Sequence, residues 1–397
     1  MRPPQERCGP TLMERGTPSP PSRTVETSAT GPVVARPARR VLLAAPCLLL
    51  TLLLAAVALL TLPAPAPAAT GPTAGFVRAS GTQLVLDGHP YRFTGYNVFS
   101  ATGRGYRCGP WVDLNAAFDA WGPGVEVFRT WFFQNLATTD GVRDWSEFDR
   151  ILATARARGY RVIAVLANQW TSCDEGYGYK TDQWYRGGYL QKDPQGTVSY
   201  RDWVREIVDR YKDDPAILMW QLVNEPEAND RDWNFNSYFS CPGDAPDVLR
   251  NWAAQITSDI KAIDSNHLVS IGTMGGGPCG TSWVNYQYVN NLPTVDLCDV
   301  HDFGNPWSPM PGDPWNGLQA EIDFCKAIGK PIFVGETGID VASVGGPDAR
   351  ARALEAKFSA QFSAGVVGEL VWNWSGWSGG GDEVAPGDPA LAVVSAY

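Results

Sequence analysis

Two glutamates of this 397-residue chain, Glu225 and Glu336, each end an apolar run of residues. A carboxylate at the end of a buried strand is costly to desolvate unless its charge is paired or used. Two carboxyl groups that face each other at roughly 5 to 5.5 Å can act as nucleophile and proton donor on a glycosidic bond. The pair therefore predicts retaining glycoside hydrolysis. The alternative is that both glutamates are only buried ion-pair partners of Arg129.

Other polar residues at the ends of apolar runs suit supporting roles. We expect Arg129 to hold Glu336 ionised, Asn224 to donate to the sugar 2-hydroxyl, and Trp372 to lie beneath the sugar. We also expect Glu225 to keep its proton to higher pH than Glu336, through burial and the neighbouring negative charge.

Aromatic residues are abundant, with 16 Trp, 14 Tyr and 15 Phe in a chain that is 19% charged. Flat apolar rings suit both a core and a groove that stacks against sugars. Tryptophans within helical stretches are expected in the core, namely Trp145, Trp203 and Trp252. Those at the ends of runs or in the following loops are sugar-binding candidates, namely Trp131, Trp170, Trp307, Trp372 and Trp377.

Apolar strand-like runs alternate with amphipathic helical stretches after a short hairpin over residues 76–93 that turns at Asp87-Gly88. The runs cover residues 93–99, 125–131, 161–168, 217–224, 268–274, 296–303, 331–336 and 368–374. Helices are expected at 145–158, 200–211, 246–263, 318–328 and 349–364. This order predicts one α/β domain over residues 76–397, a (β/α)8 TIM barrel, with a doubly wound open sheet as the alternative. A barrel places its active site at the carboxyl ends of its strands.

The N-terminal segment has a different composition. Residues 1–40 are rich in Pro, Ser, Thr and Arg and are expected to be disordered. An apolar run over 41–62 follows three arginines and leads into a Pro/Ala-rich stretch to residue 69, which is typical of a secretory signal. The run is also long enough for a membrane anchor, and Met13 is an alternative start. We expect the later residues to be exported, either secreted or anchored with the domain outside the membrane.

The net charge of -10 argues against a nucleic-acid partner. The three histidines are far apart in sequence, so we expect no metal, and nothing indicates an organic cofactor. We expect a monomer. Two glycine-rich stretches match a hydrolase nucleophile pattern (376–380) and a dinucleotide fingerprint (275–280), but neither is followed by the helix that the motif requires.

Six cysteines lie in the exported part, an even number that favours disulfides in an oxidising compartment. The candidates are Cys108, Cys173, Cys241, Cys279, Cys298 and Cys325. Their count alone leaves every pairing open. Strand alternation turns Cys298 outward, towards the helix of Cys325, and favours that pair. Loops that share the catalytic face favour the pairs Cys108 with Cys173 and Cys241 with Cys279.

Several stretches together resemble a known family. They are Gly95-Tyr96-Asn97, Phe128-Arg129-Thr130-Trp131, Trp220-Gln221-Leu222-Val223-Asn224-Glu225-Pro226, His267-Leu268-Val269-Ser270-Ile271-Gly272, Lys330-Pro331-Ile332-Phe333-Val334-Gly335-Glu336-Thr337-Gly338 and Val371-Trp372-Asn373-Trp374. From residue 76 to about 394 the chain resembles glycoside hydrolase family 5, most closely its fungal and plant-type endo-β-1,4-mannanases. The resemblance implies Glu225 as acid/base and Glu336 as nucleophile, within a shell of Arg129, Asn224, His301 and Trp372.

Two departures from the family pattern stand out. Phe303 replaces a Tyr whose hydroxyl usually bonds to the nucleophile, so we expect Glu336 to lack one donor and to be somewhat more basic, unless Tyr286 or Tyr288 fills the place. Glu227 replaces an Arg that usually contacts the polymer.

The expected activity is hydrolysis of β-1,4-linked mannan or a related mannose-containing polymer. The alternatives are an exo-β-mannosidase, a β-1,4-glucanase of the same family, and a non-catalytic sugar-binding barrel.

Overall fold

The computed structural model describes residues 75–103, 108–109, 111–174, 176, 178–230, 240–376 and 380–397. The chain divides into two compact units, residues 1–61 and 62–397, and all described residues belong to the second. The expectations for residues 1–40 and 41–69, and for Trp377, fall outside the described residues. Across the described ranges, none of the helices has the length and apolar character needed to cross a membrane.

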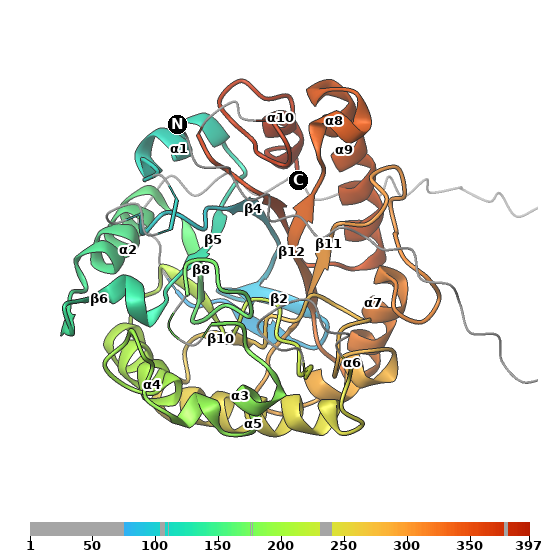
Figure 1. Ribbon diagram of the computed structural model, residues 1–397. Helices are drawn as coiled ribbons and strands as arrows, with labels where there is room; N and C mark the ends of the chain where they lie inside the picture. The colour runs from blue at the N-terminus through green and yellow to red at the C-terminus, as the bar shows by residue number, and fades with distance from the viewer. Residues whose placement is uncertain are drawn as a thin grey trace, which may run out of the picture. The chain divides into compact units, whose positions relative to one another are not determined.

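Eight parallel strands form the central sheet (Figure 1). They are β4 (Phe93–Asn97), β5 (Val127–Trp131), β8 (Arg161–Val165), β9 (Ile217–Gln221), β10 (Leu268–Ser270), β11 (Cys298–Asp302), β12 (Ile332–Gly338) and β13 (Gly368–Trp372). Their hydrogen-bonded order is β10-β9-β8-β5-β4-β13-β12-β11. Backbone hydrogen bonds from Asp296 N to Val269 O (2.9 Å) and from His301 N to Met274 O (3.2 Å) join the two end segments. The sheet therefore closes into the expected (β/α)8 barrel.

Helices surround the barrel (Figure 1). They are α1 (Leu114–Trp121), α2 (Ser146–Arg158), α3 (Asp182–Arg186), α4 (Tyr200–Tyr211), α5 (Ala245–Ile263), α6 (Val284–Asn290), α7 (Leu318–Ala327), α8 (Val341–Val344), α9 (Pro347–Ala364) and α10 (Ala390–Val394). In α4 the Ser199 hydroxyl accepts from Asp202 N at 3.1 Å and caps the first turn. Trp203 and Ile207, one turn apart, lie on its buried face.

The expected hairpin that turns at Asp87-Gly88 is present as β2 (Gln83–Leu86) and β3 (His89–Tyr91), and a further strand, β1 (Arg78–Ser80), extends it to a three-stranded antiparallel sheet. The extra strand forms because Gly81 (φ +59°) turns the chain back before β2. Leu84 packs in one buried cluster with Phe93, Phe333 and Leu370, which fills the amino-terminal end of the barrel. This leaves the carboxyl ends of the strands as the side that can hold a site.

Short elements complete the connections. They are β6 (Thr138–Thr139), β7 (Val142–Arg143) and the 3-10 helices η2 (Gln134–Ala137) and η3 (Gly188–Leu190). Three disulfides join the pairs favoured by the sequence, Cys108–Cys173, Cys241–Cys279 and Cys298–Cys325. The first two tie loops at the carboxyl ends of the strands, and the third ties β11 to α7.

Candidate active site

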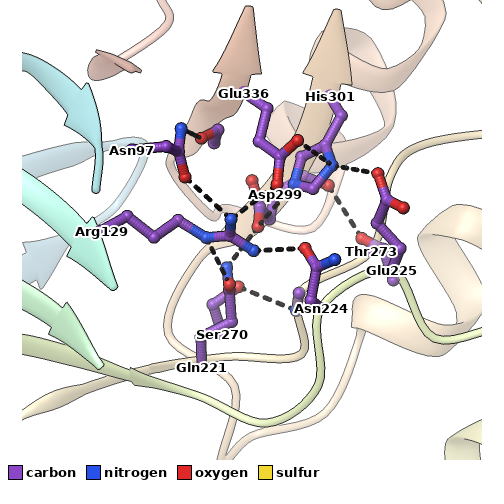
Figure 2. Close-up of polar contacts among 12 residues, drawn as sticks. Asn97, Arg129, Gln221, Asn224, Glu225, Ser270, Thr273, Asp299, His301 and Glu336 are labelled. Atoms are coloured by element: carbon purple, nitrogen blue, oxygen red, sulfur yellow. Dashed lines mark hydrogen bonds and ion pairs between the residues drawn. The ribbon is translucent and has the colours of Figure 1, made fainter. Parts of the chain in front are cut away.

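Arg129 is the centre of a buried polar network at the carboxyl end of the barrel (Figure 2). The side chain is fully buried, and its nitrogens donate to four different residues. The acceptors are Glu336 Oε1 (2.6 Å), Asn97 Oδ1 (2.9 Å), Gln221 Oε1 (2.7 Å) and Asn224 Oδ1 (2.6 Å). A buried guanidinium is stable only when such acceptors satisfy it, so β4, β5, β9 and β12 are held together by one cation.

Glu225 lies opposite Glu336, in the turn that follows β9. Its backbone has φ +58°, in the left-handed region, and is held there by a hydrogen bond from its N–H to Gly272 O at 2.9 Å. Its two carboxyl oxygens accept from different donors, Oε1 from His301 Nδ1 at 2.7 Å and Oε2 from Trp170 Nε1 at 2.5 Å. The unusual backbone conformation and the two donors together fix the direction of this carboxyl group.

The two carboxyl groups are close. One oxygen of Glu225, one oxygen of Glu336 and a ring nitrogen of His301 all lie within 4.8 Å of one another. His301 Nδ1 is 3.7 Å from Glu336 Oε2, so the imidazole touches both carboxylates. The same spacing would fit a divalent cation, but Arg129 already places a positive charge 2.6 Å from Glu336, and His301 supplies a second one when it is protonated.

The charges of this cluster shift the pKa values of its members. Burial acts to raise the pKa of Glu225, but the His301 hydrogen bond and charge and the Trp170 N–H outweigh burial and hold it below its ordinary value. Burial raises the pKa of Glu336, although His301 and Arg129 oppose the rise. Burial acts to lower the pKa of His301, yet the negative charges of Glu336 and Glu225 raise it.

These pKa directions contradict the expectation that Glu225 keeps its proton to higher pH than Glu336. The expectation rested on burial and a neighbouring negative charge, whereas Glu225 also has a hydrogen-bonded imidazole beside it. One proton is held between His301 Nδ1 and Glu225 Oε1, and it belongs to the pair.

The tryptophans divide into different roles. Trp131 is 3% exposed and packs over the Arg129 guanidinium, so its ring supports the network and has no free face for a sugar within the described structure. Trp170 donates to Glu225 instead of serving only as a stacking surface. Trp372 is half-buried and stacks on Phe99 with ring centres 5.6 Å apart.

Trp307 is 56% exposed in the loop that follows β11. Trp203 and Trp252 are buried, as expected of core residues.

Most of the hydrogen-bonding capacity of the Asn224 amide is used by neighbouring residues. Its Oδ1 accepts from Arg129, and its Nδ2 donates to Asn168 Oδ1 at 3.0 Å. One of the two amide hydrogens on Nδ2 remains for a ligand, which is compatible with the expected contact to a sugar hydroxyl.

Both departures from the family pattern have a structural account. The ring of Phe303 packs on Gly338, where an added Cβ would lie 2.1 Å from the ring. Neither Tyr286 nor Tyr288 takes the place of the missing hydroxyl, because Tyr286 donates to the Asp299 carbonyl and Tyr288 to Asp247.

Glu227 connects two loops of the catalytic face. Its Oε1 accepts from Cys279 N at 3.0 Å, and its backbone N–H donates to Gln169 Oε1 at 3.3 Å. The loop over residues 275–280 is thus a barrel loop, joined to the segment that carries Glu225.

Four residues of the network were not expected from the sequence: Asn97, Asn168, Gln221 and Asp299. Asn168 also ends an apolar run, the signal that found Glu225, and Asn97 is the last residue of β4, but an amide carries no charge that demands a partner. Gln221 and Asp299 lie within strands, so only inward alternation could have indicated them.

A closed barrel with two facing carboxyl groups at its carboxyl end defines a glycoside hydrolase site. Residues 84–379 match the family model described as cellulase (glycosyl hydrolase family 5), so the chain belongs to glycosyl hydrolase family 5.

Similar proteins agree with this family. The chain is 25% identical to mannan endo-1,4-beta-mannosidase A of Podospora anserina, over 80% of this chain and 85% of that protein. It is 29% identical to mannan endo-1,4-beta-mannosidase 8 of Oryza sativa subsp. japonica, over 67% of this chain and 80% of that protein. The resemblance to fungal and plant mannanases is thereby confirmed.

Solved structures share the fold. The endo-1,4-beta-mannanase from Rhizomucor miehei superposes with a TM-score of 0.60 at 20% identity, covering 81% of this chain and 97% of that one. The endo-1,4-beta-D-mannanase from Thermotoga petrophila RKU-1 has a TM-score of 0.59 at 20% identity, covering 77% and 99%.

Proposed function

We propose that this protein is an exported retaining β-mannanase that cleaves β-1,4-mannosidic bonds inside mannan-type polymers. The observation that carries the mechanism is the separation of the two carboxyl groups, whose nearest oxygens lie within 4.8 Å. An inverting enzyme needs room for a water molecule and separates its carboxyl groups by roughly 6.5 to 9.5 Å. The short separation therefore supports direct attack by one carboxylate.

In the first step Glu336 attacks the anomeric carbon and the glycosidic C–O bond breaks. The electron pair of that bond goes to the departing oxygen, which takes a proton from Glu225. The proton comes from the His301–Glu225 pair, since Nδ1 and Oε1 are 2.7 Å apart. Arg129, 2.6 Å from Glu336, keeps the attacking carboxylate ionised.

In the second step water attacks the glycosyl–Glu336 ester. Glu225, now ionised, takes the proton of the water, and the Glu336 carboxylate leaves. Both steps invert the same carbon, so the product keeps the configuration of the substrate. The two donors to Glu225 suit this double role, because they stabilise its ionised form between the steps.

The polymer is inferred from the relatives, since the proteins of Podospora anserina and rice are named mannan endo-1,4-beta-mannosidases. The second candidate is a β-1,4-glucan, because the matching family model is described as cellulase. Trp372 and Trp307 are available for stacking beneath either sugar chain.

The deciding experiment measures products from mannan, glucomannan, cellulose and xylan at matched concentrations. We expect the fastest release of new reducing ends from mannan, with a mixture of oligosaccharides. NMR of the first-formed sugar should show retained configuration. Faster cleavage of cellulose would overturn the mannanase assignment, and net inversion would overturn the mechanism. Release of single mannose units alone would indicate an exo-acting enzyme.

The proposal of export rests on the N-terminal composition and on the three disulfides of the barrel. We propose residues 41–69 as the signal or anchor and residues 76–397 as the catalytic domain. N-terminal sequencing of the exported protein decides between the two forms. A start near residue 70 indicates cleavage, whereas a start at Met1 or Met13 indicates an anchor.

A further inference from the structure

Asp299 lies next to His301 and has no part in the mechanism above (Figure 2). It is fully buried on β11, two residues before His301, and both side chains point into the barrel. Its Oδ2 accepts from Gln221 Nε2 and is 3.8 Å from His301 Nε2. Gly335 makes room for the carboxyl group, since an added Cβ there would lie 2.5 Å from Asp299 Oδ1.

One polar atom on each of Asp299 and His301 is incompletely bonded. Over the described residues, no hydrogen bond of good geometry reaches Asp299 Oδ1 or His301 Nε2, although the Gly335 backbone N–H acts on the Asp299 carboxyl group. Buried polar atoms without partners are rare and costly, and they concentrate where a group changes its charge or partner during function.

The charged groups that face the Asp299 carboxyl come from three strands: Arg129 on β5, His301 on β11 and Glu336 on β12. Gln221 on β9 adds a neutral donor. Arg129 supplies one fixed positive charge, and ionised Glu336 cancels it. The remaining groups are then neutral if Asp299 holds one proton and the His301–Glu225 pair holds another. Burial raises the pKa of Asp299 to about 7, against the opposing effects of His301 and Arg129.

We propose that Asp299 is a positioning residue for the acid/base step: its carboxyl gives up its proton first as pH rises, and the resulting negative charge keeps the second proton on the His301–Glu225 pair. The pair thereby retains the proton for the leaving oxygen to higher pH than it would beside a neutral residue. The kinetic part of this inference rests on the proposed roles of Glu225 and Glu336, but the titration of His301 does not.

The direct test is the pH titration of the His301 ring by NMR, on protein labelled with 15N-histidine and without substrate. The chain has three histidines, so substitution of His301 assigns its signals. In the native protein the His301 shifts should pass through two inflections, one for Asp299 and one for the pair. A single inflection would overturn the proposal without any variant.

In the Asp299→Asn variant the amide has nearly the same shape as the carboxyl group, but it cannot become negatively charged. Loss of the His301–Glu225 proton should move to lower pH by about one unit, the size expected for a removed neighbouring charge. An unshifted His301 curve would overturn the proposal. Asp299→Ser serves in the same way if the Asn variant fails to fold.

Two controls accompany this titration. His267 has its own carboxylate partner, with Nδ1 2.6 Å from Asp264 Oδ2, and its signals should be the same in native and variant protein. Asp302→Asn changes an equally buried aspartate on the same strand, which contacts Lys357 Nζ at 2.7 Å. Asp302→Asn should leave the titration curve of His301 unchanged. A shift as large as that in Asp299→Asn would mean that either substitution disturbs β11 in general.

Kinetics supply the second readout. The ratio of Asp299→Asn to native kcat/KM should fall as pH rises, by up to about tenfold between pH 6 and 8. A purely structural role would lower the ratio equally at every pH, and that result would overturn the proposal. If the protein proves inactive on every glycan, the proposed function fails, while the NMR titration still decides the role of Asp299.

Discussion

Glu225 and Glu336 differ in what surrounds them, and this difference sets their chemistry. Glu336 is bonded to a fixed cation, Arg129, while Glu225 is bonded to His301, a group that can pass on a proton. Both carboxyl groups are desolvated, so neither would be useful without these partners. The proposed assignment of nucleophile and acid therefore rests on the partners and not on the glutamates themselves.

Glu336→Ala and Glu225→Ala should fail in different ways. Glu336→Ala should abolish hydrolysis of every substrate, since no covalent intermediate can form. Glu225→Ala should lose about 10²- to 10⁴-fold on mannan but much less on an aryl β-mannoside whose leaving group needs no proton. Single-turnover kinetics on the aryl substrate measure this difference.

Glu227→Gln is the matched control, because it changes a nearby carboxylate that bonds to a loop and not to the other two glutamates. Equal residual activity of the two alanine variants on the aryl substrate would contradict the assignment.

At the scale of elements, apolar runs and helical periodicity were enough to predict the barrel. The five expected helices begin and end within about two residues of those observed, as for residues 200–211. Helices α1, α3, α6, α8 and α10 were not predicted. Each has eight residues or fewer, so none gives a helical period long enough to recognise.

Residues of the candidate site could be predicted from the sequence only where a charged residue ends an apolar run. Glu225 and Glu336 were found in this way, but the burial of Trp131 and the indole donor of Trp170 depend on how neighbouring strands turn their side chains. The hydrogen bond from His301 to Glu225 joins residues 76 positions apart, and no local pattern encodes it. The order of the two glutamate pKa values was wrong for that reason.

The loop after β10 is joined to α7 by a buried carboxyl group whose charge state depends on pH. Glu321 accepts from the Gly276 backbone N–H, and burial raises its pKa to about 8. A carboxyl group with a raised pKa in the folded state stabilises the fold fully below its unfolded pKa, near 4.5. That contribution is lost as pH rises through 8.

Glu321→Gln should therefore reduce the loss of stability between pH 5 and pH 8.5. The difference in free energy of unfolding between these two pH values should shrink by on the order of 1 to 3 kcal/mol. Urea unfolding at both pH values measures it, and Asp323→Asn, an exposed change on the same helix, is the control. The same pH dependence in Glu321→Gln and native protein would contradict this role.

At the scale of the whole molecule, the three disulfides connect loops of the catalytic face and also a barrel strand with an outer helix. Two of them hold loops of the catalytic face and the third ties β11, the strand of His301, to α7. The paired cysteines are separated by 65, 38 and 27 residues in the sequence. Cross-links over such distances substantially reduce the conformational entropy of the unfolded chain.

Protein made in an oxidising compartment should expose no reactive thiol among these six cysteines, even when denatured. Reduction should lower the free energy of unfolding by about 2 to 4 kcal/mol for each bridge lost. Thiol titration in denaturant and urea unfolding with and without reductant measure the two effects. Free thiols among these six cysteines in protein made in an oxidising compartment, or an unchanged urea midpoint after reduction, would contradict the pairing.

The left-handed backbone at Glu225 has an evolutionary consequence. A residue with a Cβ at φ +58° costs about 1 kcal/mol relative to glycine, so this chain carries a locally unfavourable residue at the position of the carboxyl group. Glu225→Gly and Glu225→Ala both delete the carboxyl, yet thermal unfolding should find the glycine variant more stable, the reverse of the usual ranking. In a related protein that is not selected for catalysis, we expect glycine or asparagine to replace glutamate at this position. Such a residue would therefore indicate a family member that has the barrel but does not hydrolyse glycans.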